Sequence, residues 1–113
     1  MRLADVGTAT DAPYPAFCLT FGKLEVEHVA WAIVRAMQVM GKEWGDSLSA
    51  GEFAAARQRD DMLNRTRGPG SYEWLYCTRW LHDFGCLEVQ GERWTPTEAF
   101  RAKIRAGGDD DSR

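Results

Sequence analysis

The 113-residue chain lacks several features that would assign it to a large class of proteins. No apolar run approaches the roughly 18 or more residues that a membrane-spanning helix takes. Residues 1–5 lack the charged-then-apolar layout of a signal peptide. Cys18, Cys77 and Cys86 are an odd number of thiols with no C-x-x-C pair, which indicates no disulfide framework. We therefore expect a cytoplasmic protein with reduced cysteines and no membrane contact.

The sequence also lacks the basic excess that is typical of proteins holding nucleic acid through its phosphates. It has 14 Lys and Arg against 17 Asp and Glu, so the net charge is −3. Residues 49–108 carry nine basic and eight acidic groups, and the acidic excess lies before and after them. The net charge therefore does not exclude a local basic patch within residues 49–108.

No set of residues indicates catalysis or a resident cofactor. Residues 45–51 match the nucleophile block of GDSL-type esterases, but no strand precedes them and neither histidine has an aspartate three residues earlier. Cys77, His82 and Cys86 supply three of the four donors that zinc takes, and helical spacing turns His82 away from Cys77. We expect no enzyme, no cofactor, no metal and no small-molecule substrate.

The hydrophobic pattern divides the chain into three parts. Residues 1–23 are predicted to be an irregular arm with a short strand over 16–21. One domain spans residues 24–108, and the aspartate tail, 109–113, is predicted to be disordered. Helical periods dominate the domain and one hairpin signal interrupts them. The predicted fold class is therefore α+β, mostly helical.

The first predicted helix runs from about residue 24 to residue 40 and ends at Gly41. Its main apolar stripe recurs at i, i+3, i+4 and i+7, and Trp31 and Val34 lie off that stripe. A second apolar face predicts packing against a partner chain or against the N-terminal arm. We expect a homodimer with Trp31 and Val34 at its twofold contact.

Capping signals place the next two helices. Ser49 and Glu52 form a capping box that opens a helix lasting to about Leu63. After a break rich in Pro and Gly, Ser71 caps a third helix that lasts to about Phe84. The core side of this helix is predicted to hold Trp74, Cys77, Leu81 and Phe84, and its opposite side Tyr72, Leu75, Tyr76, Arg79 and Asp83.

A β-hairpin is predicted directly after the third helix. Its strands cover residues 87–90 and 93–95, and Gly91 opens a type II′ turn that places Val89 opposite Trp94. A last helix is then predicted with Thr95 as N-cap, Pro96 at N1 and Glu98 at N3, ending near 106–108.

This order of elements resembles the winged helix-turn-helix superfamily over residues 49–104. The likeness is densest over residues 78–89, where a helix ends in Leu-x-x-x-Gly-x-Leu and runs into a hairpin, and residues 91–97 resemble a wing tip. The resemblance implies a winged-helix-like domain with an N-terminal helical extension, in which the third helix and the wing contact double-stranded DNA.

The first functional hypothesis is a small DNA-binding regulator. Arginine reads guanine edges or clamps phosphates, and tyrosine donates to phosphate oxygens. The candidate nucleic-acid-binding residues are Arg65 and Arg67 in the loop, Tyr72, Tyr76 and Arg79 on the third helix, and Arg93 in the wing.

The alternative is an inhibitor or adaptor that docks on a nucleic-acid-binding protein. Small acidic proteins of phages and mobile elements, including anti-CRISPR proteins, are similar in size and charge. The candidate interface residues are Trp31, Val34, Glu73, Trp80, Asp83 and Glu88. For Trp31 and Trp80, core and interface placements both stay open. Two features of the sequence distinguish the two hypotheses. They are the balance of arginines against neighbouring acidic residues and the length of the loop before the third helix.

Overall fold

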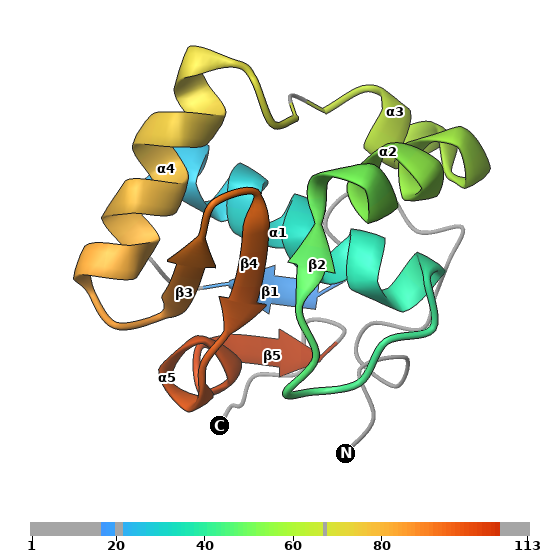
Figure 1. The fold of residues 1–113 in the computed structure, drawn as a ribbon. Helices are drawn as coiled ribbons and strands as arrows, with labels where there is room; N and C mark the ends of the chain where they lie inside the picture. Colours follow the sequence, from blue (N-terminus) through green and yellow to red (C-terminus); the bar gives the residue numbers. More distant parts are fainter. Residues whose placement is uncertain (1–16, 20–21, 67, 107–113) are drawn as a thin grey trace.

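The computed structural model describes residues 17–19, 22–66 and 68–106. They form an α+β domain, mostly helical, with a small three-stranded antiparallel sheet (Figure 1). The elements are β1 (Phe17–Leu19), α1 (Leu24–Val39), β2 (Leu48–Ser49), α2 (Ala50–Arg59), α3 (Asp61–Asn64), α4 (Tyr72–Asp83), β3 (Leu87–Gln90), β4 (Arg93–Pro96), α5 (Glu98–Arg101) and β5 (Ile104–Ala106). The predicted disordered tail, 109–113, lies outside the described residues, as does most of the arm.

Helix α1 is the centre of the core and follows the sequence prediction closely. It packs against both α2 and α4 and lies behind the sheet (Figure 1). Gly41 ends it with a positive φ of 72°, and the Lys42 N–H donates to the Met37 carbonyl at 2.8 Å. Trp31 and Val34 are 2% and 0% exposed, so this chain buries both in its own core. A single chain thus covers both side chains without a second copy, and the predicted twofold contact and dimerisation stay predictions.

Helix α2 begins as predicted but ends earlier. Ser49 and Glu52 form the complete capping box, with both reciprocal hydrogen bonds present. The chain leaves the helix at Asp60, which is extended, instead of continuing to Leu63. The Asp60 carboxylate accepts the Leu63 N–H at 3.1 Å and caps the separate helix α3. A short side chain such as that of Asp, when it accepts a hydrogen bond from a backbone N–H three residues later, favours the N-cap position of a new helix over a position inside a continuing helix.

Helix α4 matches its predicted start and most of its predicted core. The Ser71 hydroxyl accepts the Trp74 N–H at 3.1 Å, and Trp74, Cys77 and Leu81 are fully buried. Phe84, predicted to continue this stripe, is 65% exposed. It follows the last helical residue, and Gly85 then turns the chain with a φ of 76°, so helical spacing no longer sets its direction.

The hairpin has the predicted register, with Val89 opposite Trp94. Gly91 has a φ of 61° and no other described residue of the turn has a positive φ, as a type II′ turn requires. The sequence did not predict β2, which pairs with β4 to give the order β2-β4-β3. Leu48, the residue before the α2 cap, thereby sits opposite Trp94 on the other side of β4.

The last helix is shorter than predicted and has a different cap. Pro96 is the end of strand β4, and Thr97, not Thr95, is the N-cap of α5. The Thr97 hydroxyl donates to the Gly85 carbonyl at 2.6 Å, and this bond fixes the helix start beside the end of α4. Instead of helix up to 106–108, the chain forms β5, which pairs antiparallel with β1.

Candidate protein-docking surface

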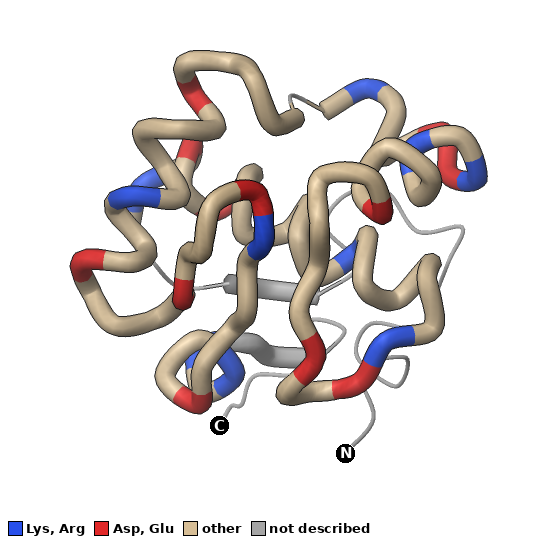
Figure 2. The backbone as a smooth tube through the Cα atoms, in the orientation of Figure 1, with Lys and Arg blue, Asp and Glu red and all other residues tan. Residues whose placement is uncertain are grey.

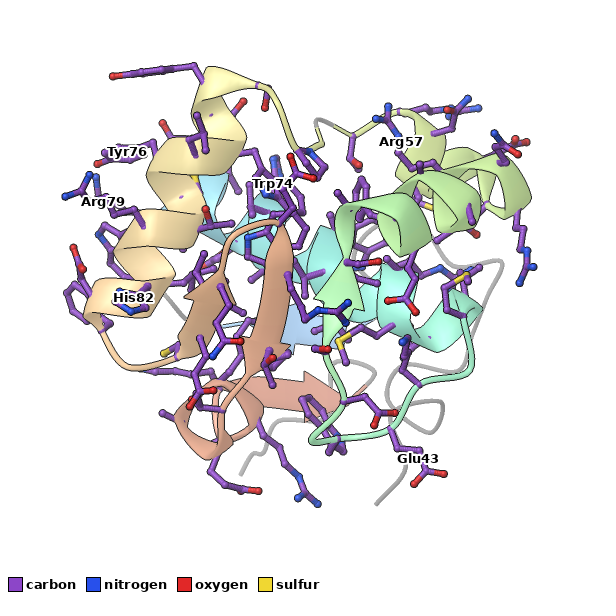
Figure 3. The ribbon with its side chains drawn as sticks, in the orientation of Figure 1. Glu43, Arg57, Trp74, Tyr76, Arg79 and His82 are labelled. Carbon is purple, nitrogen blue, oxygen red and sulfur yellow. The ribbon has the colours of Figure 1, made fainter. Side chains whose placement is uncertain are left out.

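The outward side of α4 is the most apolar exposed surface in the described part of the chain. Tyr72 is 85% exposed and Leu75 61%, and Tyr76 follows one residue later with half its surface in solvent. Figure 3 shows Tyr76 and Arg79 extending from α4 away from the rest of the molecule. These four residues occupy positions i, i+3, i+4 and i+7, so they share one side of the helix. We call them the α4 stripe.

The start of α1 extends the α4 stripe. The Lys23 ammonium donates to the Tyr76 hydroxyl at 3.4 Å and lies 5.7 Å from the centre of its ring. The neighbouring Leu24 is also largely exposed. No local pattern predicts this contact, because residues 23 and 76 come together only in the folded chain. Lys23 holds Tyr76 in place and adds one positive charge beside it.

An aromatic pair marks the C-terminal end of α4. Trp80 and Phe84 stack with their ring centres 4.2 Å apart and their planes 13° apart. Trp80 is half-buried, so it closes the core with one side and supports Phe84 with the other. Two exposed carboxylates lie close in the sequence: Asp83 directly precedes Phe84, and Glu88 follows it by four residues. The end of α4 therefore combines an exposed ring with acidic neighbours.

Carboxylates outnumber arginines on α4 and the hairpin. Glu73, Asp83, Glu88 and Glu92 stand against Arg79 and Arg93. Acidic positions lie at both ends of α4 and on the hairpin (Figure 2). The Arg93 guanidinium donates to the Ser47 hydroxyl at 3.0 Å, and this bond draws it toward the chain before β2. Counted over α4 and the hairpin together, four carboxylates exceed two arginines, and Lys23 adds a positive charge next to Tyr76.

The structure separates the other predicted contact residues from the α4 stripe. Arg65 follows α3 and lines a cavity between α1, α3 and α4, together with the predicted interface residue Glu73. Arg67 lies outside the described residues. Of the predicted nucleic-acid set, Tyr72, Tyr76 and Arg79 form one surface, and Arg65 and Arg93 lie elsewhere. Leu75 and Phe84 belong to the exposed apolar surface but were in neither predicted set.

The described thiols Cys77 and Cys86 are buried and free of disulfides. No group of three or more His, Cys, Asp or Glu side chains in this part of the chain is arranged to hold a metal ion. Burial raises the pKa of the Cys77 thiol to about 11, with Glu73 and Glu25 adding to the shift. Burial also raises the pKa of Cys86. Both thiols therefore stay protonated at neutral pH and are poor nucleophiles.

Comparisons with known proteins add no family to these observations. The chain matches no protein-family model, no curated protein and no solved structure. Within the described residues, no helix is both long enough and apolar enough to cross a bilayer.

Proposed function

We propose that this chain is a non-enzymatic protein-binding domain of winged-helix type, which acts as an inhibitor or adaptor and docks through α4. The observation that carries the proposal is where the large exposed apolar side chains lie. In the described part of the chain they are Leu24, Tyr72, Leu75, Tyr76 and Phe84. Three are on α4, one directly follows it, and Leu24 is next to the residue that contacts Tyr76. Large exposed apolar patches of this kind mark interaction sites.

The winged-helix part of the proposal rests on connectivity. Helix α4 is joined by three residues, 84–86, to the β3–β4 hairpin. Strand β2, which directly precedes α2 in the chain, is the third strand of the same sheet. In the family that the sequence resembles, the helix before the hairpin makes the contacts. We infer the same use of α4 here, with a different kind of partner.

The spacing of the α4 stripe fits a helix that lies in a groove. Amphipathic helices that bind protein grooves anchor at i, i+3, i+4 and i+7, which in α4 are Tyr72, Leu75, Tyr76 and Arg79. Twelve helical residues extend about 18 Å. Two such convex helices pressed together would bury much less than the roughly 800 Å² per partner of a standard interface. A groove that also covers Leu24 and Phe84 buries more, which favours a different protein over a second copy.

The charges around the α4 stripe define the rim of that groove. Asp83, directly before Phe84, and Glu88, in β3, are exposed carboxylates that call for basic residues on the partner. Proteins with basic clefts are typically those that bind nucleic acid. We therefore propose a nucleic-acid-binding protein as the partner, with this chain occupying part of the surface that the nucleic acid uses.

The test is capture from the host, purification of the captured protein, and a titration of that protein against variants. Leu75→Ala should weaken the complex about tenfold, since truncated interface anchors commonly cost that much. Gln58→Ala, an exposed site on α2, should leave the affinity of the complex unchanged.

A charge reversal tests the acidic part of the surface. Asp83→Lys should slow association at low salt, whereas Glu43→Lys, with the same change in charge, should not. Figure 3 shows Glu43 in the connection after α1, away from α4. Duplex DNA should also compete with the chain for the partner. The proposal would be contradicted if Leu75→Ala and Asp83→Lys had the same effects as their control variants, or if duplex DNA did not compete with the chain for the partner.

Direct reading of duplex DNA is the second candidate. Tyr72, Tyr76 and Arg79 on one helix side are the observation in its favour. Under this candidate, a random duplex binds with strong salt dependence, and Arg79→Gln weakens that binding by about 1–3 kcal/mol. Fluorescence anisotropy at two salt concentrations decides between the two. Salt-sensitive duplex binding lost in Arg79→Gln would replace the protein-docking proposal.

A further inference from the structure

A cavity of about 310 Å³ lies away from the α4 stripe, between α1, α3 and the first turn of α4. Its lining is His28, Val29, Trp31, Met62, Arg65, Thr66 and Glu73. The volume is at the small end of the roughly 300–1,000 Å³ of ligand pockets. Val29, Trp31 and Met62 give it an apolar wall, and Arg65 and Glu73 bring one charge of each sign. Apolar walls with a few polar groups are typical of small-molecule sites.

Arg65 is the unusual member of this lining. Its side chain is exposed and makes no hydrogen bond or ion pair with the part of the chain that the structure describes. A guanidinium offers a planar fork of N–H donors that matches a carboxylate. An unengaged guanidinium at the edge of an apolar wall selects a ligand that has both a carboxylate and an apolar body.

The backbone that carries Arg65 is fastened in place. The Arg57 guanidinium donates to the carbonyls on both sides of Arg65, at 3.1 Å to Asn64 and 3.0 Å to Thr66. The Thr66 hydroxyl donates to the Leu63 carbonyl at 2.7 Å. Arg57 itself lies against the Phe53 ring, 5.9 Å from its centre. A turn held at three points keeps one wall of the cavity preformed, which lowers the ordering cost of binding.

We propose that this cavity binds a small organic carboxylate with a ring-sized apolar body. The carboxylate pairs with Arg65, and the ring packs against Met62, Val29 and Trp31. Glu73 opposes a second negative charge, so monocarboxylates are preferred over dicarboxylates. The sequence did not indicate this site, and it does not depend on the proposed docking by α4.

Benzoate is the probe, and three relatives of it test each part of the proposal by calorimetry. Benzyl alcohol keeps the ring without the charge, acetate keeps the charge without the ring, and phthalate adds a second carboxylate. Benzoate should bind at least about tenfold more tightly than each of them, as expected for a charge-assisted contact beside an apolar wall. Equal binding of benzoate and benzyl alcohol, or of benzoate and acetate, would overturn the proposal.

Variants locate the binding. Arg65→Gln should remove the preference for benzoate over benzyl alcohol, whereas Arg59→Gln, an exposed arginine at the end of α2 outside the lining, should keep it. Met62→Trp should fill the cavity and abolish binding. Because a larger side chain can also disturb folding, amide chemical shifts of the unaltered protein provide a second readout. Benzoate should move the Thr66 and Glu73 resonances, and unmoved resonances at both would overturn the site.

The same variants separate this proposal from the docking proposal. Leu75→Ala should keep benzoate binding, and Arg65→Gln should keep partner binding. If Arg65→Gln loses the preference for benzoate over benzyl alcohol and still binds the partner, the result bears on the cavity proposal alone.

Discussion

The Arg35 guanidinium makes two hydrogen bonds to the Asp60 carboxylate, at 2.7 and 3.3 Å, and so ties the middle of α1 to the break between α2 and α3. Both side chains are mostly buried. The same carboxylate caps α3 through the Leu63 N–H. One residue therefore ends α2, starts α3 and anchors both to the central helix.

Removing Asp60 should destabilise the fold through two losses. Asp60→Ala takes away the α3 cap and leaves the Arg35 charge mostly buried without its partner, which together should cost about 2–3 kcal/mol of unfolding free energy. Arg35→Ala should cost less in the double variant than alone, because the pair is already broken. Urea denaturation of the four proteins measures this coupling. Strictly additive effects would contradict the interaction.

The Arg35–Asp60 pair should also make stability depend on acid pH. Hydrogen bonding from Arg35 is the main reason that the pKa of Asp60 lies below its usual value of 3.8. A carboxyl whose pKa is lower in the folded state adds stability above its unfolded pKa, and that stability is lost as pH falls through the folded value. Asp60→Asn keeps a cap acceptor but cannot ionise. The stability difference between the two proteins should be constant above about pH 5 and shrink below about pH 4. A difference that is unchanged at pH 3 would refute this linkage.

Gly68 lies where no side chain fits. A Cβ there would come within 2.9 Å of both the Phe53 ring and the Arg57 guanidinium, and the Phe53 ring is buried. Gly68→Ala should therefore destabilise by about 1–3 kcal/mol, as overpacking does. Gly51, in α2, has no atom within 4 Å of the added carbon, so Gly51→Ala should instead stabilise by about 0.5 kcal/mol. Thermal unfolding compares the pair. Similar melting temperatures for both variants would argue against the close contact.

The buried thiols should resist modification in the native protein. With Cys18 replaced by Ser, only Cys77 and Cys86 remain. Burial raises the pKa of both thiols, that of Cys77 to about 11, so at pH 8 Cys77 should react with Ellman's reagent at least about 100-fold more slowly than in denaturant. Cys86 should also react more slowly in the native protein than in denaturant. Rapid reaction of either thiol under native conditions would contradict the described core.

Local signals in the sequence were enough to predict much of the fold. The capping box at Ser49 and Glu52, the Ser71 cap and the Gly91 turn each depend on residues a few positions apart. They were predicted correctly for that reason. Phe84 was misplaced because helical spacing was extended one residue beyond the helix. The strand at Leu48 was missed because its hydrogen bonds come from β4, far along the chain.

The candidate surfaces were harder to predict than the fold. The exposed side of α4 followed from the helical wheel, so Tyr72, Tyr76 and Arg79 were grouped correctly. The sequence left both core and interface placements of Trp31 open, because the rest of the core that covers it is not local in sequence. The cavity beside Arg65 is lined by residues from α1, α3 and α4, and no spacing in the sequence predicts that these residues lie together.

The most direct test of the central claim, that α4 docks on a protein, is photocrosslinking from position 75. A benzoylphenylalanine in place of Leu75 would lie at the centre of the α4 stripe, and the same group in place of Gln58 on α2 provides the control. Irradiation of the host lysate should give one nuclease-resistant protein adduct from position 75 and none from position 58, and the adduct should be a nucleic-acid-binding protein. Nuclease-sensitive adducts from position 75, or equal adducts from both positions, would contradict the account.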